Sequence, residues 1–141
     1  MRMGGSFLRT WEWHKLLQEL QRVARPGGMI RVVESDLVGE STSPALNRLS
    51  QMLVQAFYRA GYFFAPEHNG LINYLPELFR RFSIEQVHTH LHKLEFRAGT
   101  PEGRHFVEDM NHVFRAMVPF LRKWGVSRKI TRPFASRPRA R

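Results

Sequence analysis

The chain has 141 residues, a length typical of one compact domain, with 43% hydrophobic and 24% charged residues. This balance is typical of a globular protein and excludes a wholly disordered chain. No apolar run approaches the roughly 20 residues that a membrane-spanning helix needs, and the first ten residues lack the apolar core of a secretory signal. There is no cysteine, which excludes disulfides, thiolate zinc sites, iron–sulfur clusters and a cysteine nucleophile. We therefore expect a cytoplasmic protein with no membrane span.

The net charge of +10 is concentrated at one end of the chain. Residues 122–141 contain eight of the 22 basic residues and none of the 12 acidic residues, so the rest of the chain is nearly neutral. A basic tail can attract nucleic acid or an anionic membrane surface. The alternative, which we adopt, is that residues 127–141 form a solvated, disordered tail.

The first predicted element is an amphipathic helix over about residues 11–25. Its apolar residues recur at spacings of three and four and so share one face: Trp13, Leu16, Leu17, Leu20, Val23 and Ala24. Pro26, Gly27 and Gly28 follow and should end the helix, because proline lacks the backbone donor and glycine adopts a left-handed turn easily.

A short hydrophobic run follows the glycine turn. Residues 29–34 are rich in β-branched side chains and predict a strand with apolar residues on both faces, as in a strand covered from both sides. The order of helix, tight turn and buried strand is typical of half an α/β unit.

The remaining elements alternate in the same way. A helix should start at Pro44, capped by Ser43, and end near Gly61. A helical segment over 66–74 should restart at Pro76 and end near residue 82. Residues 84–96 predict a second strand, and a long helix should run from Thr100 to about residue 124, kinked at Pro119.

Three histidines alternate along the second predicted strand. His88, His90 and His92 would point the same way, with neighbours roughly 6.6 Å apart and the outer two about 13 Å apart. One zinc ion, with bonds of about 2.0–2.1 Å, could therefore take a neighbouring pair plus an outside carboxylate, but not all three. We interpret them instead as a solvated strand face and assign no metal site. No Gly-x-Ser-x-Gly motif frames a serine, so a hydrolase triad is unsupported.

Residues 16–34 read LLQELQRVARPGGMIRVVE. This stretch resembles the class I S-adenosylmethionine (SAM)-dependent methyltransferases, which often carry a helix of the form LL-x-E-x-x-R-V-x-(R/K)-P-G-G before a hydrophobic fifth strand. The resemblance covers roughly residues 11–126. It implies a helical lid over about 44–61 that helps to form the acceptor pocket, a helix over about 70–82, a sixth strand over about 87–96, and a helical insertion after residue 100.

The family's cofactor-binding half has no counterpart in this sequence. The family binds SAM at a glycine-rich loop after its first strand, and no Gly-x-Gly occurs here. No SAM-binding residue can therefore be assigned, and we expect this chain alone neither to bind SAM nor to transfer a methyl group. The fold class that we expect is α/β: a partial Rossmann-like methyltransferase fold, rich in helix, with about two strands remaining.

The prolines and arginines of residues 127–141 make a poor replacement for the family's seventh strand. The two predicted strands should then expose their edges and invite a partner chain or self-association. Candidate residues for a small-molecule acceptor lie at the end of the first strand and around the lid: Glu34, Asp36, Tyr58, Tyr62, His68 and Asn69. Two alternatives stay open: a split methyltransferase completed by another chain, and a small basic nucleic-acid-binding protein, which the nearly neutral body disfavours.

Overall fold

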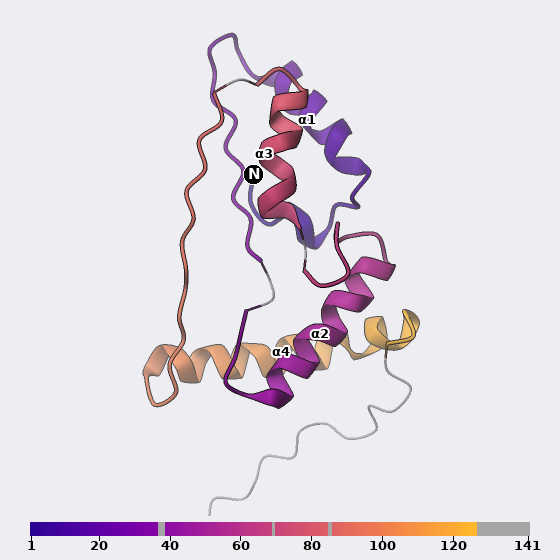
Figure 1. Cartoon of the computed structure of the whole chain (residues 1–141), viewed down its shortest axis with the longest axis vertical. Coiled ribbons are helices and arrows are strands. Elements are labelled where there is room, and N and C mark those ends of the chain that lie inside the picture. Colours follow the sequence, from indigo (N-terminus) through magenta and orange to yellow (C-terminus); the bar gives the residue numbers. More distant parts are fainter. Residues whose placement is uncertain (37–38, 69, 85, 127–141) are drawn as a thin grey trace, which may run out of the picture. The chain divides into compact units, whose positions relative to one another are not determined.

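The computed structural model describes residues 1–36, 39–68, 70–84 and 86–126, and these divide into two compact units. The first unit comprises residues 1–92 and the second begins at Lys93. The first contains a 3-10 turn, η1 (Gly4–Ser6), and the helices α1 (Glu12–Val23), α2 (Pro44–Arg59) and α3 (Leu71–Arg81); the second contains α4 (Pro101–Lys123) (Figure 1). None of the helices in the described residues is both long enough and apolar enough to cross a membrane.

Helices α1 and α2 confirm the predictions over 11–25 and 44–61. α1 ends where Ala24 turns to extended backbone, and Gly27 follows with a φ of 71°, a left-handed conformation that glycine adopts without a steric penalty. α2 begins at its predicted cap, because the hydroxyl of Ser43 accepts a hydrogen bond from the amide of Leu46 at 3.4 Å and proline occupies the first turn.

The prediction for α3 is wrong in its boundaries. No helix covers residues 66–68, and Pro76 lies inside α3 rather than restarting a helix. The reason lies at Gly70, whose φ of 72° is left-handed and cannot belong to a right-handed helix. The helix therefore starts only at Leu71.

The core of the first unit lies between α1 and α3. Five fully or almost fully buried side chains form it, two from α1 and three from α3: Trp13, Leu17, Leu71, Leu75 and Leu78. Burial of a large apolar side chain stabilises a fold by about 1.5–3 kcal/mol, so this cluster is the main source of stability for the pair. At one end of the core, the side-chain amide of Gln21 donates to the carbonyl of Phe82 at 2.7 Å.

The end of α2 is packed by aromatic rings. Phe57 stacks on Phe63 with ring centroids 4.9 Å apart and meets the edge of Tyr62 at 5.6 Å. The chain turns back at this point, because the amide of Tyr62 donates to the carbonyl of Phe57 at 2.9 Å.

The predicted α/β fold with about two strands is wrong. In the described part of the chain, residues 29–34 form only one isolated bridge, a parallel one between Arg2 and Val33. The amide of Val33 donates to the carbonyl of Met1, and the amide of Met3 donates to the carbonyl of Val33, each at 3.0 Å. The hydrophobic run thus finds a partner of three residues at the start of the chain and no sheet.

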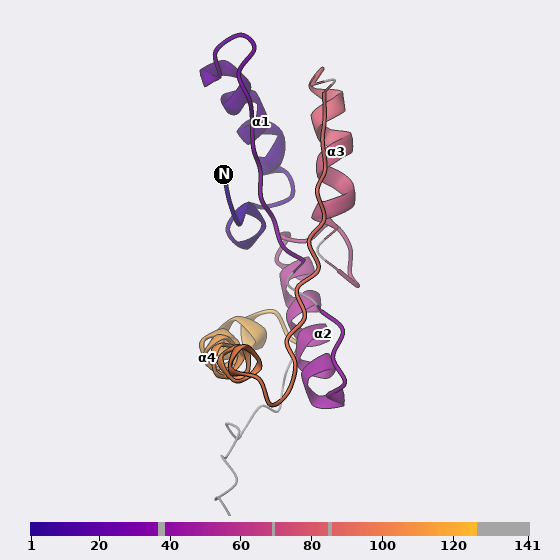
Figure 2. The same ribbon diagram turned by 90° about the vertical axis from the view of Figure 1, so that its left-hand side faces the viewer.

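The second predicted strand, over 84–96, is also wrong. Its described residues, 84 and 86–96, form no strand. A run of β-branched and apolar residues favours a strand only when a neighbouring strand satisfies its backbone. Figures 1 and 2 show the chain after α1 and the chain after α3 running extended on the same side of the α1–α3 pair. In the described residues, neither segment lies beside a strand with which it could form a sheet.

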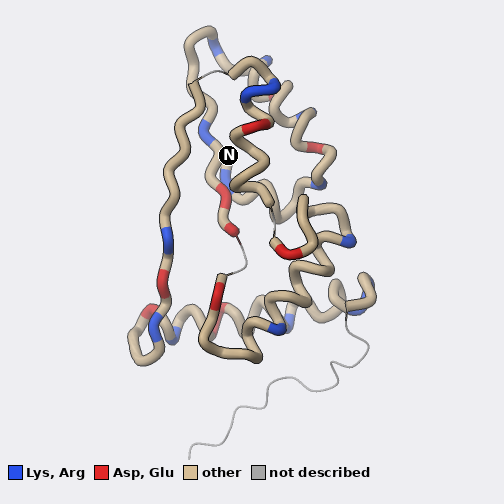
Figure 3. The backbone as a smooth tube through the Cα atoms, viewed as in Figure 1, with Lys and Arg blue, Asp and Glu red and all other residues tan. Residues whose placement is uncertain are grey.

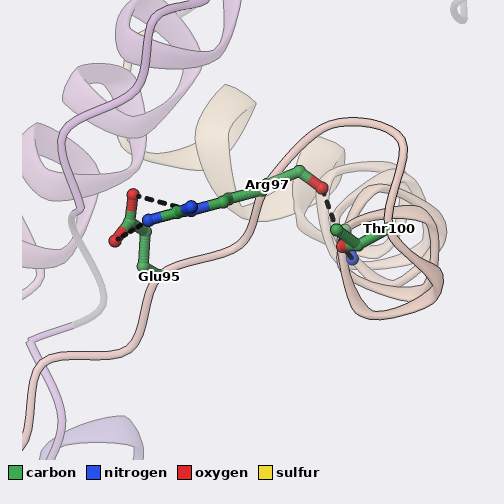
Figure 4. A network of polar contacts seen from close by, with 4 residues as sticks. Glu95, Arg97 and Thr100 are labelled. Carbon is green, nitrogen blue, oxygen red and sulfur yellow. Dashed lines mark hydrogen bonds and ion pairs between the residues drawn. The ribbon is translucent and has the colours of Figure 1, made fainter.

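The second unit is built on α4, which starts as predicted. The hydroxyl of Thr100 accepts a hydrogen bond from the amide of Gly103 at 3.0 Å and donates to the carbonyl of Arg97 at 2.9 Å (Figure 4). Arg97 in turn makes an exposed ion pair with Glu95 at 3.3 Å. Gly103 is buried, and a β-carbon at this position would collide with the Arg97 carbonyl, so the close approach of the chain requires glycine here. Residues 127–141, predicted to be a basic tail, lie outside the described residues.

Candidate functional site

Glu34 has the most distinctive environment of the six candidate acceptor residues. One oxygen of its carboxylate accepts a hydrogen bond from the amide of Gly4 at 2.6 Å, and the other accepts one from the amide of Gly5 at 3.1 Å. The donors are consecutive amides of η1, about 30 residues away in sequence. We call this arrangement the Glu34 clasp. Charge-assisted hydrogen bonds of this kind are about twice as strong as neutral ones.

The two glycines of the clasp lie in a space with no room for a side chain. A β-carbon at position 4 would lie 2.8 Å from the ring of Trp13, and one at position 5 would collide with Leu71. The clasp is therefore seated directly on the α1–α3 core. It fixes the start of the chain to the segment after α1.

A second junction joins the entrance of α1 to the end of α2. The guanidinium of Arg9 lies 3.9 Å from the centre of the Tyr62 ring, and the amide of Thr10 donates to the carbonyl of Gly61 at 2.8 Å. A β-carbon on Gly61 would lie 2.7 Å from the indole of Trp11. One face of the candidate Tyr62 is thus covered by a cation from its own chain.

The structure does not gather the remaining candidates around one cavity. Tyr58 is exposed on the last turn of α2, Asp36 is exposed after the clasp, and His68 is exposed in the loop before α3. Asn69 lies outside the described residues. No contact joins Glu34 to Tyr58, Tyr62 or His68 among the hydrogen bonds and ring contacts of the described residues.

A shallow hollow of about 310 Å³ lies instead in the second unit, at the start of α4. It is lined by Ala98, Gly99, Gly103, Arg104, Val107 and Glu108. None of the six candidate residues contributes to it, and its one basic side chain, Arg104, hydrogen-bonds at 3.4 Å to the nearby carbonyl of Gly99.

The clasp also bears on how well the described residues fit SAM. Adjacent glycine amides in a loop can receive an anionic or polar ligand. The adjacent glycine pair whose surroundings are most enclosed, Gly4 and Gly5, already donates to Glu34. This loop therefore does not fit the cofactor, and no step of methyl transfer can be assigned to it.

The three alternating histidines are all exposed, as expected for a solvated face. In the described residues of this single chain, no group of three or more histidine, aspartate or glutamate side chains is placed to hold a metal ion. His105 and His112 are likewise exposed, on α4.

Comparisons of the chain with protein-family models, with curated proteins and with solved structures find no match. These comparisons therefore do not test the resemblance of residues 16–34 to the methyltransferases.

One feature of the sequence indicates the clasp. Gly4 and Gly5 are adjacent and are followed by Ser6, a small and polar run that is typical of a tight turn in close contact with another segment. Its partner, 30 residues away, has no local signature.

Proposed function

We propose that this chain is the acceptor-side portion of a SAM-dependent methyltransferase, and that it transfers no methyl group without a polypeptide that supplies the cofactor-binding half. The observation that carries the proposal is the stretch over residues 16–34. Its helix, its Pro-Gly-Gly turn and its hydrophobic segment ending in an acid match the family in residue type and spacing.

The local structure of this stretch supports the proposal. α1 ends at Val23, directly before the Pro-Gly-Gly turn, and Gly27 adopts the left-handed backbone that such a turn needs. The segment after the turn runs extended to Glu34, where the clasp holds it (Figure 1). The order of helix and turn is the order that the resemblance implies, and an extended segment with one isolated bridge stands where the family has its fifth strand.

The unpaired state of the extended segments supports the second half of the proposal. Within the described residues, the bridges of residues 29–34 come down to one, between Val33 and Arg2, and Met29 is 89% exposed. Apolar segments without a ladder are ready to pair with a strand of another polypeptide. In the proposal, a partner chain binds SAM and pairs with the extended segment over residues 29–34. Helix α2 contributes to the pocket of a small-molecule acceptor. The cytoplasm is the proposed compartment, given the absence of cysteine.

The experiment is co-expression with the polypeptide encoded immediately upstream of this reading frame. If that polypeptide carries a Gly-x-Gly loop after a hydrophobic run, the two should co-purify, and the pair should bind S-adenosylhomocysteine. The chain with residues 29–34 changed to alternating serine is the matched control and should not co-purify. An upstream sequence without any glycine loop, or a pair that binds no S-adenosylhomocysteine, would contradict the proposal.

A further inference from the structure

Residues 86–92, which read QVHTHLH, form an extended segment with an available edge. Figure 1 shows this part of the chain, after α3, running almost straight, and the backbone hydrogen bonds outside the helices of the described residues include none from residues 86–92. Leu91 is 73% exposed and all three histidines are exposed. Figure 3 shows no lysine, arginine, aspartate or glutamate on the segment, so no fixed charge opposes pairing with a like segment.

The segment is complementary to a second copy of itself. In an antiparallel pair with a two-fold axis at Thr89, Val87 faces Leu91 of the second copy, and Thr89 faces its own equivalent. Aliphatic and threonine pairs of this kind favour strand pairing. The same register places His88 opposite His90 of the second copy, twice, on the other face. An isologous interface of this type closes on two subunits.

The pairing brings four imidazoles together on one face. The two histidines of each copy lie about 6.6 Å apart along the strand, and the β-carbons of facing residues lie about 4.5–5.5 Å apart. Imidazole nitrogens that reach from the corners of such a rectangle can meet above its centre at the bond length of about 2.0–2.1 Å that zinc requires. Four neutral nitrogen ligands in tetrahedral geometry suit zinc, whereas magnesium prefers oxygen.

We propose that two copies of this chain pair through residues 86–92 and bind one zinc ion with His88 and His90 of each copy. Neither the strand pairing alone nor the histidines of one copy alone would make a stable complex. Among the described residues of a single copy, no group of three histidine, aspartate or glutamate side chains is placed to hold a metal ion, and an isolated two-stranded ribbon is marginal in water. The metal supplies the ligand bonds that make the pairing stable, and the second copy supplies half of the ligands. The proposal is independent of methyl transfer.

Sedimentation equilibrium of the full chain, with and without zinc chloride, tests the proposal. The mass should correspond to a monomer in the presence of a chelator and to a dimer with zinc, and titration calorimetry should give one zinc per two chains. His90→Ala removes two of the four ligands from each site. We expect it to weaken zinc-dependent dimerisation by more than about 100-fold. Losing a residue that only supports a metal ligand already weakens metal binding by up to about 100-fold, and this variant loses the ligands themselves.

The matched control is the double variant His105→Ala/His112→Ala, which removes two exposed histidines from α4 and should dimerise with zinc as the unmodified chain does. Circular dichroism should show the same helix content in every variant, because His90 is exposed and lies outside the core. A monomer at every zinc concentration would overturn the proposal. So would zinc-driven dimers of the His90→Ala chain with unchanged affinity, or equal dimerisation with magnesium chloride.

Discussion

The Glu34 clasp predicts a specific loss of stability for Glu34→Gln. Glutamine has nearly the shape of glutamate, so the substitution leaves the packing intact and changes only the bonds to Gly4 and Gly5. The amide oxygen can still accept one hydrogen bond, but the amide nitrogen now faces a backbone donor. A hydrogen bond to a charged group contributes about 1.5–3 kcal/mol, and the clasp is only partly buried. The free energy of unfolding should therefore fall by about 2 kcal/mol.

The assay is urea unfolding followed by circular dichroism, with hydrogen exchange of the Gly4 and Gly5 amides measured by nuclear magnetic resonance. Both amides should be protected in the unmodified chain and should exchange at least tenfold faster in the variant, since a factor of ten corresponds to about 1.4 kcal/mol. Asp36→Asn, which makes the same change at an exposed position two residues on, should shift the unfolding energy by less than about 0.5 kcal/mol. Equal effects of the two substitutions would refute the clasp.

Three further substitutions test other parts of the structure by urea unfolding. Leu17→Ala should cost about 2–5 kcal/mol, because it opens a cavity in the α1–α3 core; a loss below 1 kcal/mol would contradict that core. Gly61→Ala should cost about 1–3 kcal/mol, because φ is 79° there and the new methyl group meets Trp11; a neutral outcome would show that the junction is loose. Thr100→Ala should lower the free energy of unfolding by about 1 kcal/mol, because the hydrogen bond to the Gly103 amide is lost. An unfolding curve identical to that of the unmodified chain would contradict this cap.

The sequence predicted helices better than strands, for a physical reason. α1, α2 and α4 are specified by their own residues: an apolar stripe, a proline in the first turn of two of them, and the hydroxyl caps Ser43 and Thr100. A strand has no such local support, since each of its hydrogen bonds needs another segment. Residues 29–34 have a strand's composition, but in the described part of the chain they form one isolated bridge, between Val33 and Arg2. The composition favours a strand, but the described residues contain no neighbouring strand that would complete one.

The candidate site likewise depends on contacts between distant segments, which local sequence patterns do not predict. Its position at the end of the hydrophobic run makes Glu34 a candidate site residue, and the structure shows its carboxylate bound to the amides of Gly4 and Gly5. Its partners are backbone amides, which leave no trace in a residue pattern. Tyr62 is a candidate because it lies near the predicted lid, and packing explains its aromatic side chain equally well. Its contact with Arg9 depends on how the chain enters α1, 50 residues earlier, and no local spacing contains that information.

In the proposed function, this chain is a portion of a methyltransferase that does not hold the cofactor by itself. The most direct measurement is isothermal titration calorimetry of the purified chain with S-adenosylhomocysteine. We predict no saturable heat of binding for the chain alone, and binding only after its partner polypeptide has been added. Micromolar affinity of the lone chain for S-adenosylhomocysteine would contradict the claim.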